Sequence, residues 1–177
     1  MILFAEVKKE GKWAESDVLR TVDHDTIFMN AILFAFLAGV DDIGHNERFK
    51  PKGIPEDASD AAKEYYGRLA GISVAPSYLT LRELKTVDWE NETVTLKGLM
   101  DKKRLGKLQE QIRQGNPDWT LVYPYALASS DPDDVHFELQ VPTKFQFADF
   151  YEHVVKKLSN LGYPDDDARI VFWFRED

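Results

Sequence analysis

The sequence predicts one α+β domain, in which a mixed or antiparallel sheet packs against two or three main helices. Short apolar runs stand near both ends of the 177-residue chain, at Ile2–Val7 and Ile170–Phe174. Each run is dense enough in apolar side chains to be a strand covered on both faces. Longer segments between them carry helix caps and helical apolar spacing. We therefore expect the N- and C-terminal strands to lie close together in the middle of the sheet, and residues 1–177 to form a single domain.

The first part of the chain predicts a hairpin followed by a buried helix. The run Ile2–Val7 leads into the turn sequence KKEG, and Trp13 lies on the returning strand. The segment Thr26–Val40 is apolar on nearly all sides, with Asp25 or Thr26 as a cap and Gly39 near its end. An all-apolar helix of this kind is typical of the centre of a domain.

Two helix starts and one strand follow. The segment Gly53–Gly71 has Pro55 at a first-turn position, where the missing N–H of proline costs nothing. Thr80 and Glu83 have the spacing of a capping box. Glu92–Gly98 alternates as a strand does.

The second half predicts two further helices around an irregular region. Leu99–Gly115 is amphipathic and is weakened at Gly106. Trp119–Pro142 suggests short strands around a loop. Thr143 and Gln146 repeat the capping-box spacing at the start of a long helix that Gly162 ends. The turn after that helix leads into the final strand.

Composition excludes several classes of function. The chain has no cysteine, which excludes disulfides, thiolate metal sites and cysteine nucleophiles and fits a reducing cytoplasm. Its net charge of −9 disfavours direct nucleic-acid binding. The longest apolar run, Ala31–Val40, is shorter than the about 20 residues of a membrane span, and the N-terminal sequence lacks the pattern of a signal peptide. We expect a cytoplasmic protein without membrane association.

Charged groups are the candidate binding sites. Three groups of acidic residues could form a surface that mimics nucleic acid, although they could equally be solvated turns. The groups are Asp88, Glu90 and Glu92, then Asp131, Asp133 and Asp134, then Asp165, Asp166 and Asp167. A basic stripe could contact phosphate, or could be a solvated helix face; it comprises Lys102, Lys103, Arg104 and Lys107. The acidic groups lack the loop spacing of an EF-hand.

No cofactor, metal site or catalytic group is predicted. His24 lies between Asp23 and Asp25, which resembles a metal-binding cluster, but Asp25 can cap a helix and no second ligand pair follows. The sequence contains neither a glycine-rich phosphate loop nor a nucleophile elbow.

Four segments, in this order, resemble a family of uncharacterised proteins common in phage genomes. They read ILFAEVKKEGKW, then NAILFAFLAGV with FKPKGIPEDAS, then SYLTLREL with DWE, then LGYPDDDARIVFWF. The resemblance covers the chain except about Gly98–Val141. Members typically begin Met-Gly-Cys-Asp-Ile-His, and this chain lacks that start, since Ile2 stands where the histidine would be. Members also often carry Gly-His-Ser-His-Ser before Trp-Leu-Thr-Leu, where this chain reads ISVAPSYLTL.

The resemblance and its departures imply a binding function. The residue types that could hold a metal or move protons are the ones this chain lacks, so we expect no enzymatic activity. We expect a phage-encoded accessory protein that binds and inhibits a host protein, such as a defence protein, in the host cytoplasm. One alternative is a binder of a small nucleotide signal that uses the basic stripe. Another is a hydrolase or transferase with an unrecognised site. The identity of the partner and the oligomeric state stay open.

Overall fold

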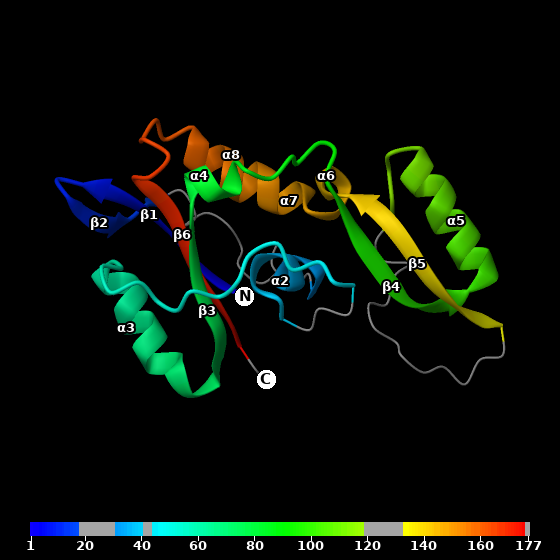
Figure 1. Ribbon diagram of the computed structural model, residues 1–177, viewed down its shortest axis with the longest axis horizontal. Helices are drawn as coiled ribbons and strands as arrows, with labels where there is room; N and C mark the ends of the chain where they lie inside the picture. The colour runs from blue at the N-terminus through cyan, green and yellow to red at the C-terminus, as the bar shows by residue number, and fades with distance from the viewer. Residues whose placement is uncertain (18–30, 41–43, 119–132, 176–177) are drawn as a thin grey trace.

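A four-stranded antiparallel sheet lies at the centre of the fold in the computed structural model, which describes residues 1–17, 31–40, 44–118 and 133–175 (Figure 1). The strand order is β2-β1-β6-β3. The bounds are β1 Ile2–Lys9, β2 Lys12–Glu15, β3 Ser73–Thr80 and β6 Ala168–Arg175. The terminal strands β1 and β6 are the two central ones, with Ile2 opposite Trp173 and Val7 opposite Ala168. The predicted α+β class and the predicted pairing of the terminal strands are confirmed.

The last strand is covered on both faces. Ile170, Phe172 and Phe174 point into the main core, which also contains the buried helix α2 (Ala31–Ala38). Trp173 points to the opposite face, where Tyr66 of helix α3 (Asp60–Leu69) packs against it. Phe172 and Trp173 are both 0% exposed. These aromatic side chains therefore stabilise the fold by removing apolar surface from water. The N-terminal part of the predicted Thr26–Val40 helix, together with Asp25 and His24, lies outside the described residues.

A two-stranded antiparallel sheet forms an arm on one side of the molecule (Figure 1). It consists of β4 (Thr93–Asp101) and β5 (Asp134–Pro142), and helix α5 (Lys102–Arg113) packs against it. Leu99 was predicted to begin the helix, but it lies in β4 instead. Its side chain is buried in the sheet opposite His136, and Asp101 caps the helix by accepting the Arg104 backbone N–H at 2.9 Å.

The predicted helix after Thr143 is a series of short helical segments that crosses the main core (Figure 1). They are α6 (Thr143–Gln146), α7 (Ala148–Phe150), the π-helical segment η4 (Tyr151–Val155) and α8 (Lys156–Ser159). The second capping box is wrong, because Pro142 occupies the N-cap position. The Thr143 hydroxyl donates instead to the backbone oxygen of Trp89 at 2.9 Å.

The first capping box is confirmed, at helix α4 (Leu81–Leu84), where both reciprocal hydrogen bonds between Thr80 and Glu83 are present. The helix start predicted at Pro55 is wrong. Helix α3 begins after Ser59, whose hydroxyl accepts the backbone N–H of Ala62 at 3.3 Å. Pro55 lies in the preceding loop, and its backbone oxygen accepts the N–H of Ala58. Pro55 therefore begins a turn in this loop and not the helix.

Strand β3 was not predicted. It runs along one edge of the main sheet, and its register shifts between Val74 and Ser77. Ala75 adopts a φ of 48° within this bulge, and Pro76 follows it. An edge strand tolerates both features, because its outer backbone groups need no partner strand. After α3, the single turn η2 (Ala70–Ile72) leads into it. None of the helices within the described ranges combines the length and apolar character needed to cross a membrane.

Candidate functional site

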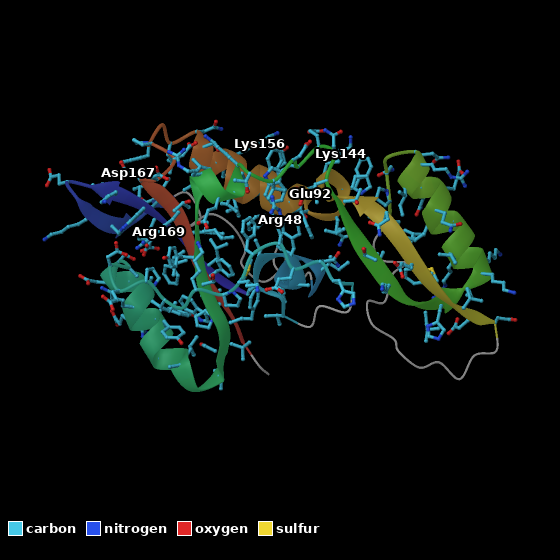
Figure 2. All side chains as sticks on the ribbon, in the orientation of Figure 1. Arg48, Glu92, Lys144, Lys156, Asp167 and Arg169 are labelled. Atoms are coloured by element: carbon cyan, nitrogen blue, oxygen red, sulfur yellow. The ribbon has the colours of Figure 1, made fainter. Side chains whose placement is uncertain are left out.

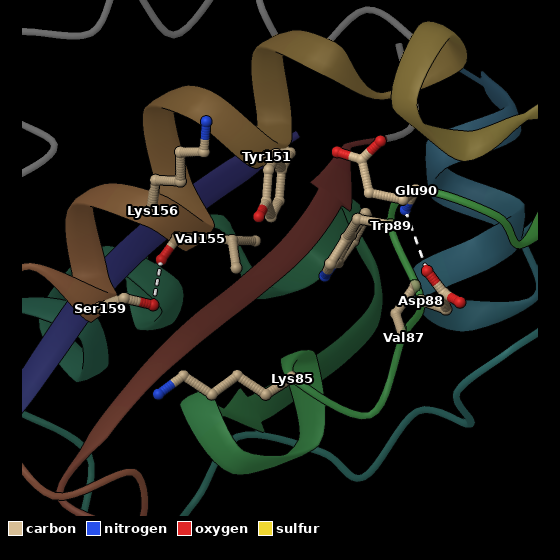
Figure 3. A pocket seen from close by; sticks show the side chains of 9 residues that line it. All are labelled: Lys85, Val87, Asp88, Trp89, Glu90, Tyr151, Val155, Lys156 and Ser159. Atoms are coloured by element: carbon tan, nitrogen blue, oxygen red, sulfur yellow. Dashed lines mark hydrogen bonds between the residues drawn. The ribbon is translucent and has the colours of Figure 1, made fainter.

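A pocket of about 320 Å³ opens between the segment that follows α4 and the helical segments η4 and α8 (Figure 3). Its lining consists of Lys85, Val87, Asp88, Trp89, Glu90, Tyr151, Val155, Lys156 and Ser159. Val87, Trp89 and Val155 are buried and Tyr151 is half-buried, so they form an apolar floor. The charged lining residues are exposed. The pocket thus has an apolar interior and a charged rim.

One wall is a turn that its own hydrogen bonds hold in place. The indole N–H of Trp89 donates to the backbone oxygen of Leu84 at 3.0 Å. The carboxylate of Asp88 accepts the backbone N–H groups of Glu90 at 3.2 Å and Asn91 at 3.1 Å. The hydrogen bond from the Asn91 side chain is the main cause that lowers the pKa of Asp88, and the backbone bonds lower it further. Asp88 is therefore ionised at neutral pH and positions the turn.

The opposite wall contains the π-helical turn. The backbone N–H of Lys156 donates to the oxygen of Tyr151, five residues earlier. Such turns are rare and frequently occur at functional sites. Tyr151 stacks on Trp89 across the pocket, with ring centroids 5.5 Å apart and an interplanar angle of 27°. Figure 3 shows Tyr151, Val155 and Trp89 together at the centre of the pocket.

Opposite charges occupy opposite sides of the rim. Figure 3 shows Lys85 and Lys156 on one side and Asp88 and Glu90 on the other. Lys156 pairs with Glu152, and this hydrogen bond is the main cause that raises the pKa of Lys156, to which the charge of Glu90 adds. The charge of Lys156 is therefore balanced within its own helical segment.

The structure brings two of the three predicted acidic groups to this pocket. Asp88 and Glu90 line it, and Asp165 contacts it through a 2.6 Å ion pair with Lys85. Asp166 pairs with Arg82 through two hydrogen bonds of 2.6 and 2.7 Å.

The remaining predicted acids near this region also have structural contacts. Arg48 contacts Glu92 at 3.1 Å (Figure 2), and Lys144 contacts Glu90 at 3.6 Å. The backbone oxygen of Asp167 accepts the N–H of Lys8. Most of the predicted acidic surface near the pocket is thus neutralised by cations from other elements.

The other predicted charged residues lie on the arm. Asp133 and Asp134 stand at the start of β5, and Asp131 lies outside the described residues. The basic residues Lys102, Lys103, Arg104 and Lys107 lie on α5. Arg104 forms an ion pair of 3.1 Å with Asp101. These groups do not line the pocket. Among the residues that the structure describes, no cluster of three or more histidine or carboxylate side chains could hold a metal ion.

A buried ion network was not predicted. Glu6 of β1 and Arg169 of β6 lie directly opposite each other and are joined by a 2.8 Å ion pair. Arg169 also donates to Asp57 at 2.9 Å and stacks on the ring of Trp13, 3.8 Å from its centroid. The carboxylate of Glu6 accepts the backbone N–H of Ser59 at 2.7 Å. This network bonds the loop before α3 to the sheet.

Comparisons of the chain with models of known families, with curated proteins and with solved structures found no match.

Proposed function

We propose that this chain is a phage-encoded accessory protein that binds a host protein and inhibits it, and that its contact surface is centred on the pocket. The stacked pair of Trp89 and Tyr151, enclosed by a charged rim, carries this proposal. Protein interfaces combine an aromatic centre with a polar rim. The phage origin and the choice of a defence protein as target come from the sequence resemblance.

The acidic residues contribute to the rim of the proposed contact surface. A mimic of nucleic acid presents carboxylates that are not neutralised, so that they can replace phosphates. Asp165, Asp166 and Glu92 are instead paired with Lys85, Arg82 and Arg48. The geometry therefore favours an interface with an aromatic anchor over one based on negative charge alone.

Affinity capture from host lysate tests the proposal. The wild-type chain is expected to retain a stoichiometric partner, and Tyr151→Ala is expected to weaken its binding by about 30-fold, because truncating a central aromatic costs roughly 2 kcal/mol or more. Lys63→Glu changes an exposed charge on α3, away from the pocket, and serves as the control. Equal capture by the wild type and Tyr151→Ala contradicts the proposal, as does the absence of any partner.

A second candidate function is the binding of a nucleotide or another phosphorylated ligand at α5. Lys102, Lys103 and Lys107 are exposed and have no ion pair within the described residues. Lys102 and Lys103 occupy the first turn of α5, where the helix dipole already favours negative charge. A bound phosphate would relieve the repulsion there. A nucleotide at 100 times its dissociation constant should stabilise the fold by about 2.7 kcal/mol, and Lys102→Ala with Lys103→Ala should remove this effect.

A further inference from the structure

We propose that strand β5 pairs edge to edge with β5 of a second copy of this chain, in an antiparallel register centred on Phe137. The two arms would then form one four-stranded sheet, in the order β4-β5-β5-β4. This inference goes beyond the proposed function, because β5 does not line the pocket. The protection of the other sheet edges, the direction of the β5 backbone groups and the side chains that self-pairing brings together support it.

The other three sheet edges are short, bulged or covered. Strand β2 has four residues. Strand β3 carries a bulge, and its Pro76 oxygen accepts the backbone N–H of Gly53 at 2.9 Å. On β4, the side-chain amide of Asn46 donates to the Thr95 oxygen at 2.8 Å, and its side-chain oxygen accepts the Thr95 N–H at 2.7 Å. Proteins protect edges in these ways, because an open edge is a template for pairing with another chain.

Within the part of the chain that the structure describes, the edge formed by β5 has none of these protections. Strand β5 is nine residues long and pairs with β4 in one continuous register without a bulge. Pro142 stands at its end. Figure 1 shows β4 on the side of the arm nearer α2, so the outer edge of β5 faces away from the main core. A sheet of two strands gains stability from further strands.

The hydrogen bonds of Asn46 show which backbone groups face the outer edge of β5. Thr95 turns both of its backbone groups toward Asn46 and thus away from β5. Its partner Gln140 therefore turns its own groups away from β4, and alternation directs those of His136 and Glu138 the same way. None of the described residues forms a hydrogen bond to these outward groups. They form a regular row of donors and acceptors for another strand.

A register centred on Phe137 brings compatible side chains together. It places His136 opposite Glu138 of the second copy, and Asp134 opposite Gln140, each twice by symmetry. The backbone groups of all four residues face the edge, so each of these pairs exchanges two backbone hydrogen bonds. Main-chain bonds of this kind supply the affinity, and the side chains select the register.

The neighbouring registers are less favourable. A centre at Glu138 sets two copies of its carboxylate opposite each other, and a centre at His136 sets Glu138 opposite Asp134. Like charges directly opposite destabilise a strand pair. A centre at Leu139 sets Pro142, which lacks an N–H, opposite His136. Registers centred nearer the ends of the strand pair fewer residues.

The internal ion pair of Glu138 is compatible with the proposed register. Its carboxylate lies 3.2 Å from the Lys97 ammonium, and 59% of its side chain stays exposed. In the dimer, Lys97, Glu138 and His136 of the second copy would form a row across the sheet. The pairing therefore requires no free charge on Glu138.

Disulfide trapping tests the register directly, because the chain has no cysteine. The single variants His136→Cys and Glu138→Cys are mixed and oxidised, and mass spectrometry follows the mixed and the self-linked dimers. Opposite residues in such a pair have Cα atoms about 5.5 Å apart, which lies within the span of a disulfide. The mixed dimer should form at least about fivefold faster than either self-linked dimer, whose cysteines would lie diagonally, roughly 7 to 8 Å apart. A self-linked dimer that forms as fast as the mixed one overturns the inference.

Sedimentation equilibrium of the full chain supplies a readout without cysteine. His136→Lys places a cation opposite Glu138 and should tighten the dimer, whereas His136→Glu places like charges opposite each other and should weaken it. Each change occurs twice by symmetry, so each dissociation constant should move by about 2- to 30-fold. Within its own sheet His136 stands opposite Leu99, so the two variants differ in the charge that they present at the edge.

Lys63→Glu, on α3, is the control and should leave the dissociation constant unchanged. Equal dissociation constants for His136→Lys and His136→Glu overturn the inference, because a misfolded variant would not tighten the dimer. A wild-type chain that stays monomeric up to about 1 mM overturns it as well.

Discussion

Replacing Arg169 with methionine should strongly destabilise the protein. Arg169 is 3% exposed and its partner Glu6 is 0% exposed. The substitution leaves the Glu6 carboxylate buried without its cation, while the backbone N–H of Ser59 still donates to it at 2.7 Å. Breaking a buried ion pair by removing one partner costs about 3 to 5 kcal/mol, because the other charge stays buried without compensation. Since a domain of this size has a stability of roughly 5 to 15 kcal/mol, the loss would be a large fraction of the total.

A second variant separates the ion pair from simple loss of packing. Replacing Glu6 with leucine together with Arg169→Met removes both charges, and such replacements by apolar residues are often close to neutral. The Ser59 N–H would then lack its acceptor, which costs about 1 to 3 kcal/mol. We therefore expect the double variant to be more stable than Arg169→Met alone, although less stable than the wild type.

Urea unfolding followed by circular dichroism measures these differences, provided that the m-value does not change. Lys97→Met is the matched control, because it removes a more exposed ion pair with Glu138 at 3.2 Å and should cost less than about 1 kcal/mol. The reasoning is refuted if Arg169→Met costs no more than this control. It is also refuted if the double variant loses as much free energy of unfolding as Glu6→Leu and Arg169→Met lose together as single variants.

Three further predictions concern a cap, a carboxylate and a helix end. Thr80→Ala should lower the free energy of unfolding by about 1 kcal/mol because it breaks the capping box of α4; an unchanged melting temperature contradicts this. Burial raises the pKa of Asp57, but the hydrogen bond and the charge of Arg169 lower it more, so the net shift is downward. The ionised Asp57 carboxylate therefore stabilises the fold above about pH 4, and this stabilisation is lost as the pH falls through the folded-state pKa. Asp57→Asn should accordingly flatten the acid limb of the melting temperature plotted against pH, and an unaltered limb would contradict the assignment. Lys102→Glu with Lys103→Glu should raise the free energy of unfolding by about 0.3 to 1 kcal/mol for each charge, because negative charge is favoured at the start of α5. The melting temperature should rise slightly, and a fall would contradict this prediction.

The central strands could be predicted because their side chains report burial directly. Ile2–Val7 and Ile170–Phe174 are almost wholly apolar, and such runs have few places in a fold other than the middle of a sheet. The buried ion pair also has a counterpart in these parts of the sequence. Glu6 and Arg169 are isolated opposite charges in or beside these apolar strands, and antiparallel pairing of the chain ends is what would place them face to face.

Strand β3 and the π-helical turn could not be predicted from local patterns. Pro76 and the bulge at Ala75 remove the regular alternation that marks a strand, and the sheet edge accommodates them. The spacing of Thr143 and Gln146 is that of a capping box, yet the Thr143 hydroxyl is bonded to Trp89. In both cases a tertiary contact decides the local conformation.

The pocket depends on contacts between segments that are far apart in the sequence. Asp88 and Glu90 stood out as acids, whereas Trp89 between them supplies the aromatic surface that makes the site. Its stacking partner Tyr151 lies in a segment whose sequence predicts an ordinary amphipathic helix. A tryptophan between two acids in a turn is a signal for such a site, because the ring must find burial in another element.

The aspartates of the turn before β6 have a structural role that their sequence does not reveal. Asp165 accepts the backbone N–H of Arg82 through its own backbone oxygen and the ammonium of Lys85 through its carboxylate. Asp166 binds the guanidinium of Arg82. These bonds join the turn that begins the core strand to α4, the helix that carries Lys85 to the rim of the pocket. Because β6 is held in the centre of the sheet, the turn before it also fixes the position of Lys85. Asp165 and Asp166, which the sequence predicts as a contact surface, therefore help to set the geometry of the pocket.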